Sequence, residues 1–201
     1  MDVAAIVRLI EEHLGDRAVF IGGVAVECYA PYRTTHDIDV VTRERDFSTL
    51  KAALLRAGFS HRKTHLEKHT FKSREAGEVD AYTSRVGEVP VEEDLFRRAR
   101  KLTYAGVAVS VTSLEDLLRF KFTAGREMDL ADLAVLLHDR RGEVDVKLAQ
   151  RLVGLALLRL RSPLIPDLLP EEYGWQARRA IKAWLREVGW LTGARRSTRE
   201  E

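Results

Sequence analysis

Two carboxylates, Asp37 and Asp39, stand two residues apart in the stretch DIDVV. Residues i and i+2 of a strand point to the same face, so both side chains are expected on one side of a sheet. Two ionised carboxylates this close repel each other unless a cation or a proton lies between them. Magnesium takes oxygen ligands of this kind together with substrate phosphates. The spacing therefore predicts a site for Mg²⁺.

Two adjacent glycines, Gly22 and Gly23, follow the short apolar run AVFI. The run predicts a buried strand, and VAVECYA after the glycines predicts a short helix that ends near Pro31. Residues without a side chain let a phosphate approach the backbone, and the N–H groups at a helix start attract anions. We therefore expect a phosphate-binding loop at this pair.

Each feature alone is common, since a DxD pair often ends a solvated strand and paired glycines often form a tight turn. Their combination is more specific: an apolar residue, Gly22-Gly23, and then two acids alternating with apolar residues from Asp37 onward. This order resembles the signature of the polymerase-beta-like nucleotidyltransferase superfamily. The strings IGGVAVECY and YRTTHDIDVV resemble more narrowly its AbiEii/MenT-like group, which includes toxins of bacterial and archaeal toxin–antitoxin pairs.

A second block, TSLEDLLRFKFTAGREMDLADLAVLL, resembles the downstream helical signature of the same group. The resemblance then covers about residues 18–137. It implies an α/β (α+β) fold, with the mixed sheet and flanking helices of a nucleotidyltransferase and a C-terminal helical bundle. We place the α/β core in residues 1–111 and the helical region, packed on that core, in residues 112–201.

The resemblance also assigns catalytic residues. Asp37 and Asp39 match the metal-binding carboxylates, and the superfamily's third acid lies on a later strand between apolar residues. Asp80 in EVDAY fits that frame, while Glu78, two residues earlier on the same face, is the alternative. We expect Asp80 to complete a metal site, with two Mg²⁺ ions in the geometry common to such enzymes.

Nucleotide binding is assigned partly to the helical block. Lys121 matches a lysine that contacts the triphosphate in the family, and Asp132 matches an acid of the same signature. An alternative remains open, because Gly125 could end the helix, so that Asp129 and Asp132 only cap the next one.

Arg33, just before the acidic strand, also matches an arginine of the family. We assign it to nucleotide binding together with Gly22-Gly23. It could touch phosphate or only pair with a carboxylate, and both interpretations stay open.

Apolar periodicity places the remaining elements. Amphipathic helices are expected over residues 2–14 and 46–58, capped by Asp2 and Asp46; two strands over residues 67–83 around a turn at Ala76-Gly77; and a strand over residues 107–113 that ends in an N-cap at Ser113. Four helical patterns separated by glycine or proline follow.

The composition, 45% hydrophobic and 32% charged, is typical of a soluble globular protein. No apolar run approaches the ~18 residues of a membrane span, and the acidic start predicts no export signal. A single cysteine, Cys28, excludes an internal disulfide framework and fits a reducing cytosol. We therefore expect a cytoplasmic protein with no membrane partner.

The predicted reaction is transfer of an NMP from an NTP to an acceptor hydroxyl. Three classes remain open: an enzyme that modifies RNA or protein, as toxin-like members do; an enzyme that modifies a small molecule, as aminoglycoside and lincosamide nucleotidyltransferases do; and a non-catalytic nucleotide-binding module that regulates a partner.

We favour RNA, such as tRNA, as the acceptor, because residues 140–201 hold 13 Lys and Arg against 8 Asp and Glu, a net charge of +5. Most of Arg178, Arg179, Lys182 and Arg186 are spaced to share one helix face, which could follow a phosphate backbone. A cognate antitoxin is the further partner that the resemblance implies.

Overall fold

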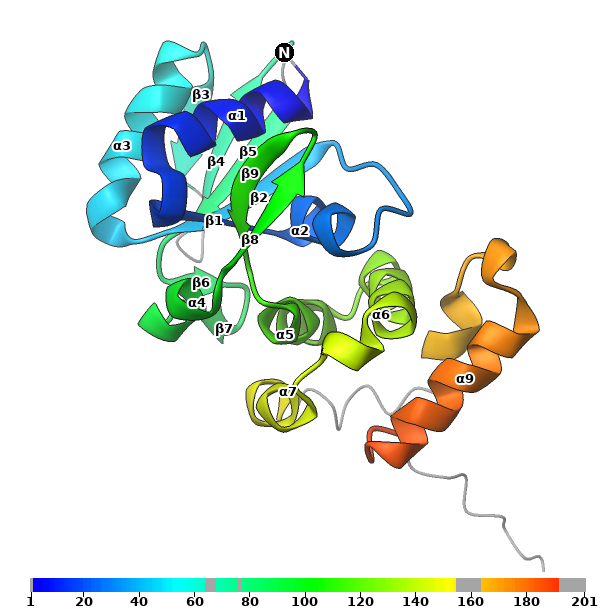
Figure 1. Cartoon of the computed structure of the whole chain (residues 1–201). Helices are drawn as coiled ribbons and strands as arrows, with labels where there is room; N and C mark the ends of the chain where they lie inside the picture. Colours follow the sequence, from blue (N-terminus) through cyan, green and yellow to red (C-terminus); the bar gives the residue numbers. More distant parts are fainter. Residues whose placement is uncertain (1, 64–67, 76, 155–163, 192–201) are drawn as a thin grey trace, which may run out of the picture.

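The computed structural model describes residues 2–63, 68–75, 77–154 and 164–191, and its centre is a mixed sheet (Figure 1). Seven strands form this sheet in the order β3-β4-β5-β2-β1-β9-β8. β1 runs parallel to β9 and β2 parallel to β5, whereas the other neighbours are antiparallel. The expected α/β class with a mixed sheet is confirmed. The strands are β1 Ala18–Ile21, β2 Asp37–Thr42, β3 Ser60–Lys63, β4 Lys68–Ser73, β5 Gly77–Tyr82, β8 Arg100–Tyr104 and β9 Val107–Val111, and a separate hairpin pairs β6 Arg85–Val86 with β7 Val89–Pro90.

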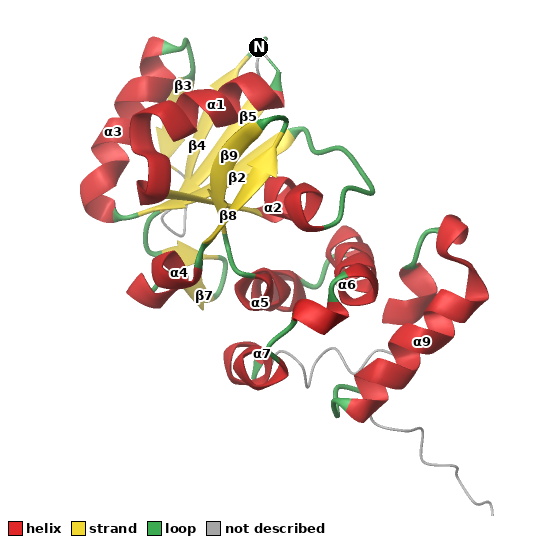
Figure 2. Ribbon diagram, viewed as in Figure 1, coloured by secondary structure: helices red, strands yellow, loops and turns green. Residues whose placement is uncertain are grey.

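Both faces of the central strands are buried, which explains why β1 is apolar throughout. Phe20 and Val40 lie on one face in a large core with α1 (Val3–Leu14) and α3 (Glu44–Arg56). Val19 and Ile21 lie on the opposite face in a smaller cluster with β7, α4 (Glu93–Arg98) and Phe120 of the helical half. Figure 2 shows α1 and α3 over one face and α4 with the small hairpin near the end of the sheet.

The structure confirms two of the three N-cap residues that were expected from the sequence. Asp2 accepts a hydrogen bond from the Ala5 N–H at 2.8 Å and caps α1, and Ser113 caps the helix that follows β9, as expected. The prediction that Asp46 caps the next helix is wrong, because the N-cap residue there is Arg43. Helix α3 begins at Glu44, and Asp46 lies buried in its first turn, where a carboxylate favours the helix dipole.

Every described element after Val111 is helical: α5 Leu114–Ala124, α6 Glu127–Asp139, α7 Val146–Val153 and α9 Gly174–Glu187, with short 3₁₀ turns between them. Figure 1 shows α5, α6 and α7 at one end of the sheet and α9 beyond α6. One hydrophobic core contains residues of both halves, such as Phe20 and Leu133, so packing continues across residue 111. The division into residues 1–111 and 112–201 therefore stays a prediction. In the described part of the chain, no helix is long and apolar enough to cross a membrane.

We predict that Ser113→Ala lowers the free energy of unfolding by about 1 kcal/mol, because the Ser113 hydroxyl accepts from the Asp116 N–H and donates to its carboxylate at 2.8 Å. Urea unfolding measures the change. Ser48→Ala, at an exposed position inside α3, is the control and should cost nothing. Equal stability of the two variants would contradict the importance of this cap.

Candidate active site

The two glycines begin helix α2 (Gly22–Tyr29), directly after the last residue of β1. The expected helix thus starts two residues earlier than VAVECYA. Gly22 has φ = +58°, and a Cβ atom there would overlap the Asp39 carboxylate. A Cβ on Gly23 would overlap the Thr35 side chain. The structure thus gives a nearer reason for both glycines than room for a phosphate, namely the close approach of the next strand and the loop before it.

The acidic strand β2 places its carboxylates beside this turn. Asp39 lies opposite Ile21 of β1 on one side and opposite Asp80 of β5 on the other, and Asp37 lies opposite Glu78. Directly opposed residues share a face of the sheet, so these acids form two rows at one edge. Asp37 is exposed, whereas Asp39 is partly buried.

Burial raises the pKa of the Asp39 carboxyl above its usual value, and the neighbouring Asp80 carboxylate adds to the rise. The Tyr82 hydroxyl, which donates to Asp39 Oδ1 at 3.2 Å, acts in the opposite direction, as do the charges of Lys121 and Lys68. The protein alone therefore stabilises the negative charge of Asp39 less than water does.

Asp80 has its own protein partners. Lys68 of β4 forms an ion pair with Asp80 Oδ2, and Thr70 donates to Oδ1 at 2.7 Å. The alternative third acid, Glu78, pairs with Lys72 at 2.6 Å and does not line the cleft. Of the two candidates, Asp80 is the one that faces Asp39.

A cleft of about 400 Å³ collects nearly all the predicted residues. Asp132 is the exception, because its side chain is fully buried and does not line the cleft. The lining residues that matter for the chemistry are Gly22, Gly23, Arg33, Thr35, Asp37, Asp39, Lys68, Asp80, Tyr82, Lys121, Arg126 and Asp129.

A buried ionic network forms one wall of the cleft. The Lys121 ammonium contacts Asp129 at 3.0 Å and Asp132 at 2.6 Å, and only 7% of the Lys121 side chain is exposed. Arg33 donates two hydrogen bonds of 2.8 Å to the Asp132 carboxylate, and the Tyr32 hydroxyl donates a further one. Arg33 thus pairs with a carboxylate, as one of the two open interpretations held.

Gly125 ends α5 in a left-handed conformation, so α5 and α6 are separate helices. The capping alternative is confirmed only for Asp129, whose carboxylate accepts from the N–H of the α6 N-cap residue, Arg126, and also pairs with Lys121. Asp132 does not cap α6, because its carboxylate is bound by Lys121 and Arg33. Burial would raise the pKa of Asp129 and of Asp132, but hydrogen bonds and charges from Arg126, Arg33 and Lys121 outweigh it and lower both.

Three residues around the acids were not singled out by the sequence: Lys68 and Tyr82, which line the cleft, and Thr70, which bonds Asp80 behind it. All three lie on the β4–β5 hairpin, whose register pairs Thr70 with Asp80 and Lys68 with Tyr82. The available signal was the alternation of side chains around the predicted turn. The actual register pairs Ser73 with Gly77, so a turn centred at Ala76-Gly77 would have given other partners.

The three predicted acids do not form a ready three-ligand metal site. No group of three or more His, Cys, Asp or Glu side chains within the described ranges is arranged to hold a metal ion. Asp37 and Asp39 do fit one Mg²⁺, because this ion is commonly bound by one or two carboxylates together with substrate phosphates. Close packing of Asp39 against Gly22 holds one of these two ligands in place.

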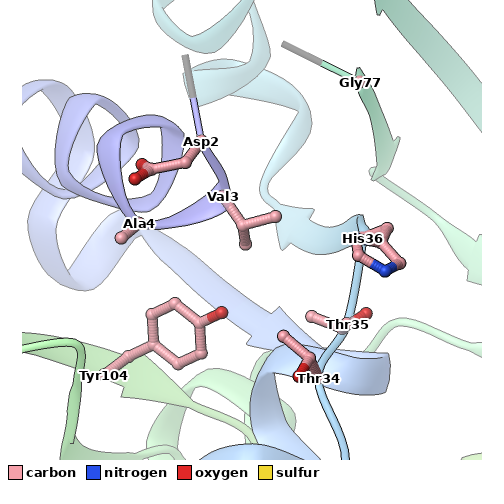
Figure 3. A pocket seen from close by; sticks show the side chains of 8 residues that line it. All are labelled: Asp2, Val3, Ala4, Thr34, Thr35, His36, Gly77 and Tyr104. Carbon is pink, nitrogen blue, oxygen red and sulfur yellow. The ribbon is translucent and has the colours of Figure 1, made fainter.

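A second hollow, of about 440 Å³, lies on the other side of Thr35 (Figure 3). The N-terminal turn of α1, the loop 34–36, Gly77 and Tyr104 surround it. The Asp2 carboxylate is engaged as the α1 cap, and the Thr35 N–H donates to Glu27. The lining offers hydroxyl groups but no assembled set of catalytic side chains, so we assign no reaction to it.

We predict that Asp39→Asn stabilises the metal-free protein at neutral pH. The folded-state pKa of Asp39 lies above its ordinary value, so this group favours folding at low pH and loses that contribution as pH rises through the folded-state pKa. Removing the charge removes the penalty, and the melting temperature in EDTA should rise by about 2–4 °C for each kcal/mol relieved.

The control for this prediction is Asp37→Asn, which alters an exposed carboxylate and should leave the melting temperature unchanged. The melting temperature of Asp39→Asn should also vary less with pH than that of the wild type. A fall of several degrees in Asp39→Asn would show instead that this carboxylate stabilises the fold.

We further predict that Lys121→Met destabilises the protein by about 3 kcal/mol, because two buried aspartates then lose a cationic partner. Chemical denaturation of the metal-free protein measures this change. Lys147→Met, the same substitution at an exposed position of α7, should have no effect. Unchanged stability of Lys121→Met with weakened NTP binding would assign Lys121 to the nucleotide alone.

The comparisons with known proteins agree with this geometry. Residues 4–173 match the family described as nucleotidyl transferase AbiEii toxin, type IV TA system. No curated protein sequence matches the chain.

Among solved structures, the lincosamide antibiotic adenylyltransferase LnuA, in its lincomycin-bound form, has a TM-score of 0.50 at 17% identity, covering 67% of this chain and 93% of its own. The antibiotic-resistance factor ANT(2″)-Ia has a TM-score of 0.48 at 15% identity, with 93% and 94% covered. A Thermotoga maritima protein described as a nucleotidyltransferase has a TM-score of 0.47 at 19% identity, with 70% and 97% covered.

At these identities the likeness to LnuA shows the fold alone. The family match spans most of the sequence and confirms the predicted nucleotidyltransferase. The chain belongs to the AbiEii family of toxin nucleotidyltransferases.

Proposed function

We propose that the protein is a magnesium-dependent enzyme that transfers an NMP from an NTP to a hydroxyl group of an RNA. The observation that carries this proposal is the junction of β1, α2 and β2. There a helix N-terminus and two carboxylates without a built-in cation, Asp37 and Asp39, line one cleft.

The triphosphate is expected at the start of α2. The first N–H groups of a helix have no intrahelical partner and attract anions. Asp37 and Asp39 would hold Mg²⁺, which, when bound, neutralises charge on the triphosphate oxygens. Arg126, which pairs with Asp129 at the rim, adds positive charge beside this position.

The chemistry requires an acceptor oxygen in line with the leaving pyrophosphate. As the bond from this oxygen to the α-phosphorus forms, the bond from the α-phosphorus to the pyrophosphate oxygen breaks. The acceptor proton passes to the Asp80 carboxylate, which lies opposite Asp39. The protein thus contributes positioning and electrostatic stabilisation, with no covalent intermediate.

Lys121 and Asp132 have different parts in this proposal. Lys121 lines the cleft, so its charge acts on the triphosphate from within the ionic network. Asp132 does not line the cleft and acts only by holding Lys121 and Arg33 in place. We therefore propose Asp132 as a positioning residue and not as a direct nucleotide ligand.

An RNA acceptor is supported by one face of α9. Trp175 is 63% exposed, and the Arg179 guanidinium lies 5.3 Å from the centre of its ring. The half-buried Lys182 and the exposed Arg186 continue the same face at helical spacing. Exposed aromatic and basic side chains together can stack on bases and contact phosphates.

The expected four-residue row needs a correction at Arg178. This residue is half-buried and donates to the Leu169 carbonyl oxygen, so it is directed toward the preceding segment. It is three residues from Trp175, yet the packing of α9 on its neighbours turns it away from the exposed face. The row that can meet RNA is therefore Trp175, Arg179, Lys182 and Arg186.

The remaining parts of the proposal concern the cell. The type IV family description supports a cognate antitoxin as partner. We also propose a cytoplasmic location, which the single cysteine supports. A small reading frame for an antitoxin beside the gene would support the proposed antitoxin partner.

We predict that the protein, given Mg²⁺, each α-labelled NTP in turn, total tRNA and cell protein, labels RNA. Arg179→Glu with Arg186→Glu should suppress the labelling at least about tenfold and weaken the salt dependence of RNA binding, because phosphate contacts are lost. Arg8→Glu with Arg56→Glu changes the same charge at exposed positions of α1 and α3 and serves as the control.

Label on protein, or only on an added aminoglycoside or lincosamide, would reject RNA as the acceptor while leaving nucleotidyl transfer in place. Equal suppression by the two double variants would show that overall charge, and not the α9 face, governs the reaction.

A further inference from the structure

Both oxygens of the Asp80 carboxylate are engaged by the protein itself. Lys68 holds Oδ2 through its ammonium group, and Thr70 donates to Oδ1 at 2.7 Å. A divalent ion that used Asp80 as a ligand would compete with both donors. Only 15% of the Asp80 side chain is exposed, so water replaces these partners poorly.

The β4–β5 register makes this arrangement part of the fold. Thr70 is directly opposite Asp80, and Lys68 is opposite Tyr82, one step further along the same face. A long side chain reaches such a diagonal neighbour easily. Lys68 lines the cleft and is 32% exposed, so its ammonium is anchored at the sheet and still faces the substrate space.

The acids of the cleft therefore differ in how their charge is compensated. Asp80 has the Lys68 ammonium within ion-pair distance, whereas the Asp37 carboxylate makes no hydrogen bond or ion pair with any side chain in the described ranges. The Asp39 carboxylate accepts only the neutral Tyr82 hydroxyl, and Lys121 and Lys68 act on it through their charge without forming an ion pair. One dipositive ion at Asp37 and Asp39 would balance that pair. A second at Asp80 would lie beside an ammonium group and be repelled by it.

We propose that the Lys68 ammonium takes the place of a second metal ion, so that the site binds a single divalent cation together with the NTP. This inference rests on the proposed function and replaces the two Mg²⁺ ions expected from the sequence with one ion and one lysine. Lys68 then stabilises negative charge on the acceptor oxygen as the proton of that oxygen moves to Asp80.

The test counts Mn²⁺ bound per chain by electron paramagnetic resonance, with each of the four α,β-methylene nucleoside triphosphates, which cannot release pyrophosphate. The wild type should bind one Mn²⁺. Lys68→Met should bind two, and the pair should show magnetic coupling because ions in such sites lie ~3.5–4 Å apart. Lys68→Gln, which keeps a hydrogen-bond donor for Asp80 without the charge, should also bind two.

The matched control is Lys72→Met, which removes the other lysine of β4 that pairs with an acid of β5 on the same face. Lys72 lies outside the cleft and is paired with Glu78, so this variant should bind one Mn²⁺. Thermal melting of all variants in EDTA verifies that each is folded.

Two Mn²⁺ ions in the wild type, or one in both Lys68 variants, would overturn the inference and leave the proposed function standing. No bound Mn²⁺ in any protein would overturn the proposed metal site, and the inference with it.

Discussion

The pairing of β2 between β1 and β5 is the constraint on which the site depends. It places Asp39 opposite Ile21 and opposite Asp80, against the backbone of Gly22. The residue at position 22 must therefore be glycine, and it must also turn the chain from β1 into α2 with a positive φ. One packing contact thus fixes the distance between a helix N-terminus and a carboxylate, and in the proposed function a magnesium-bound phosphate spans this distance.

The helical half is tied to this junction by buried charge. Asp132 of α6 accepts from Arg33, Tyr32 and Lys121, so its carboxylate is fully paired although no part of it meets solvent. Desolvation offsets most of the attraction in such a network, so its net contribution to stability is small. Its geometry is nevertheless specific, because any shift of α6 leaves a charge unpaired. The network therefore sets where Lys121 lies in the cleft.

Local patterns in the sequence could predict the strands β1, β2, β4, β5 and β9, the glycine turn and the paired acids, because each depends on neighbours a few residues away. The polar or very short strands β3, β6, β7 and β8 were not predicted. The prediction of Asp46 as the N-cap was wrong because an acid is favoured both at the N-cap and in the first turn of a helix. Packing decides which of these two positions the residue takes. The prediction that Arg178 belongs to the exposed basic row was wrong because its hydrogen-bond partner, the Leu169 carbonyl oxygen, lies in another segment of the chain. Lys68 was missed because a hairpin register, unlike a strand, is set by the turn, and shifting it by one residue moves every side chain to the other face.

The contrast between compensated and uncompensated acids connects the two halves of the cleft. Asp80 and Asp129 each have a lysine or arginine within the fold, and such pairs resist a further cation. Asp37 has no such partner in the described structure, and Asp39 is partly buried against a glycine, which raises the pKa of its carboxyl. A carboxylate in that state gains most from a divalent ion, since the ion supplies the charge that the protein leaves out. The electrostatics of the folded chain therefore support the proposal that the metal and the triphosphate bind together at the junction of β1, α2 and β2.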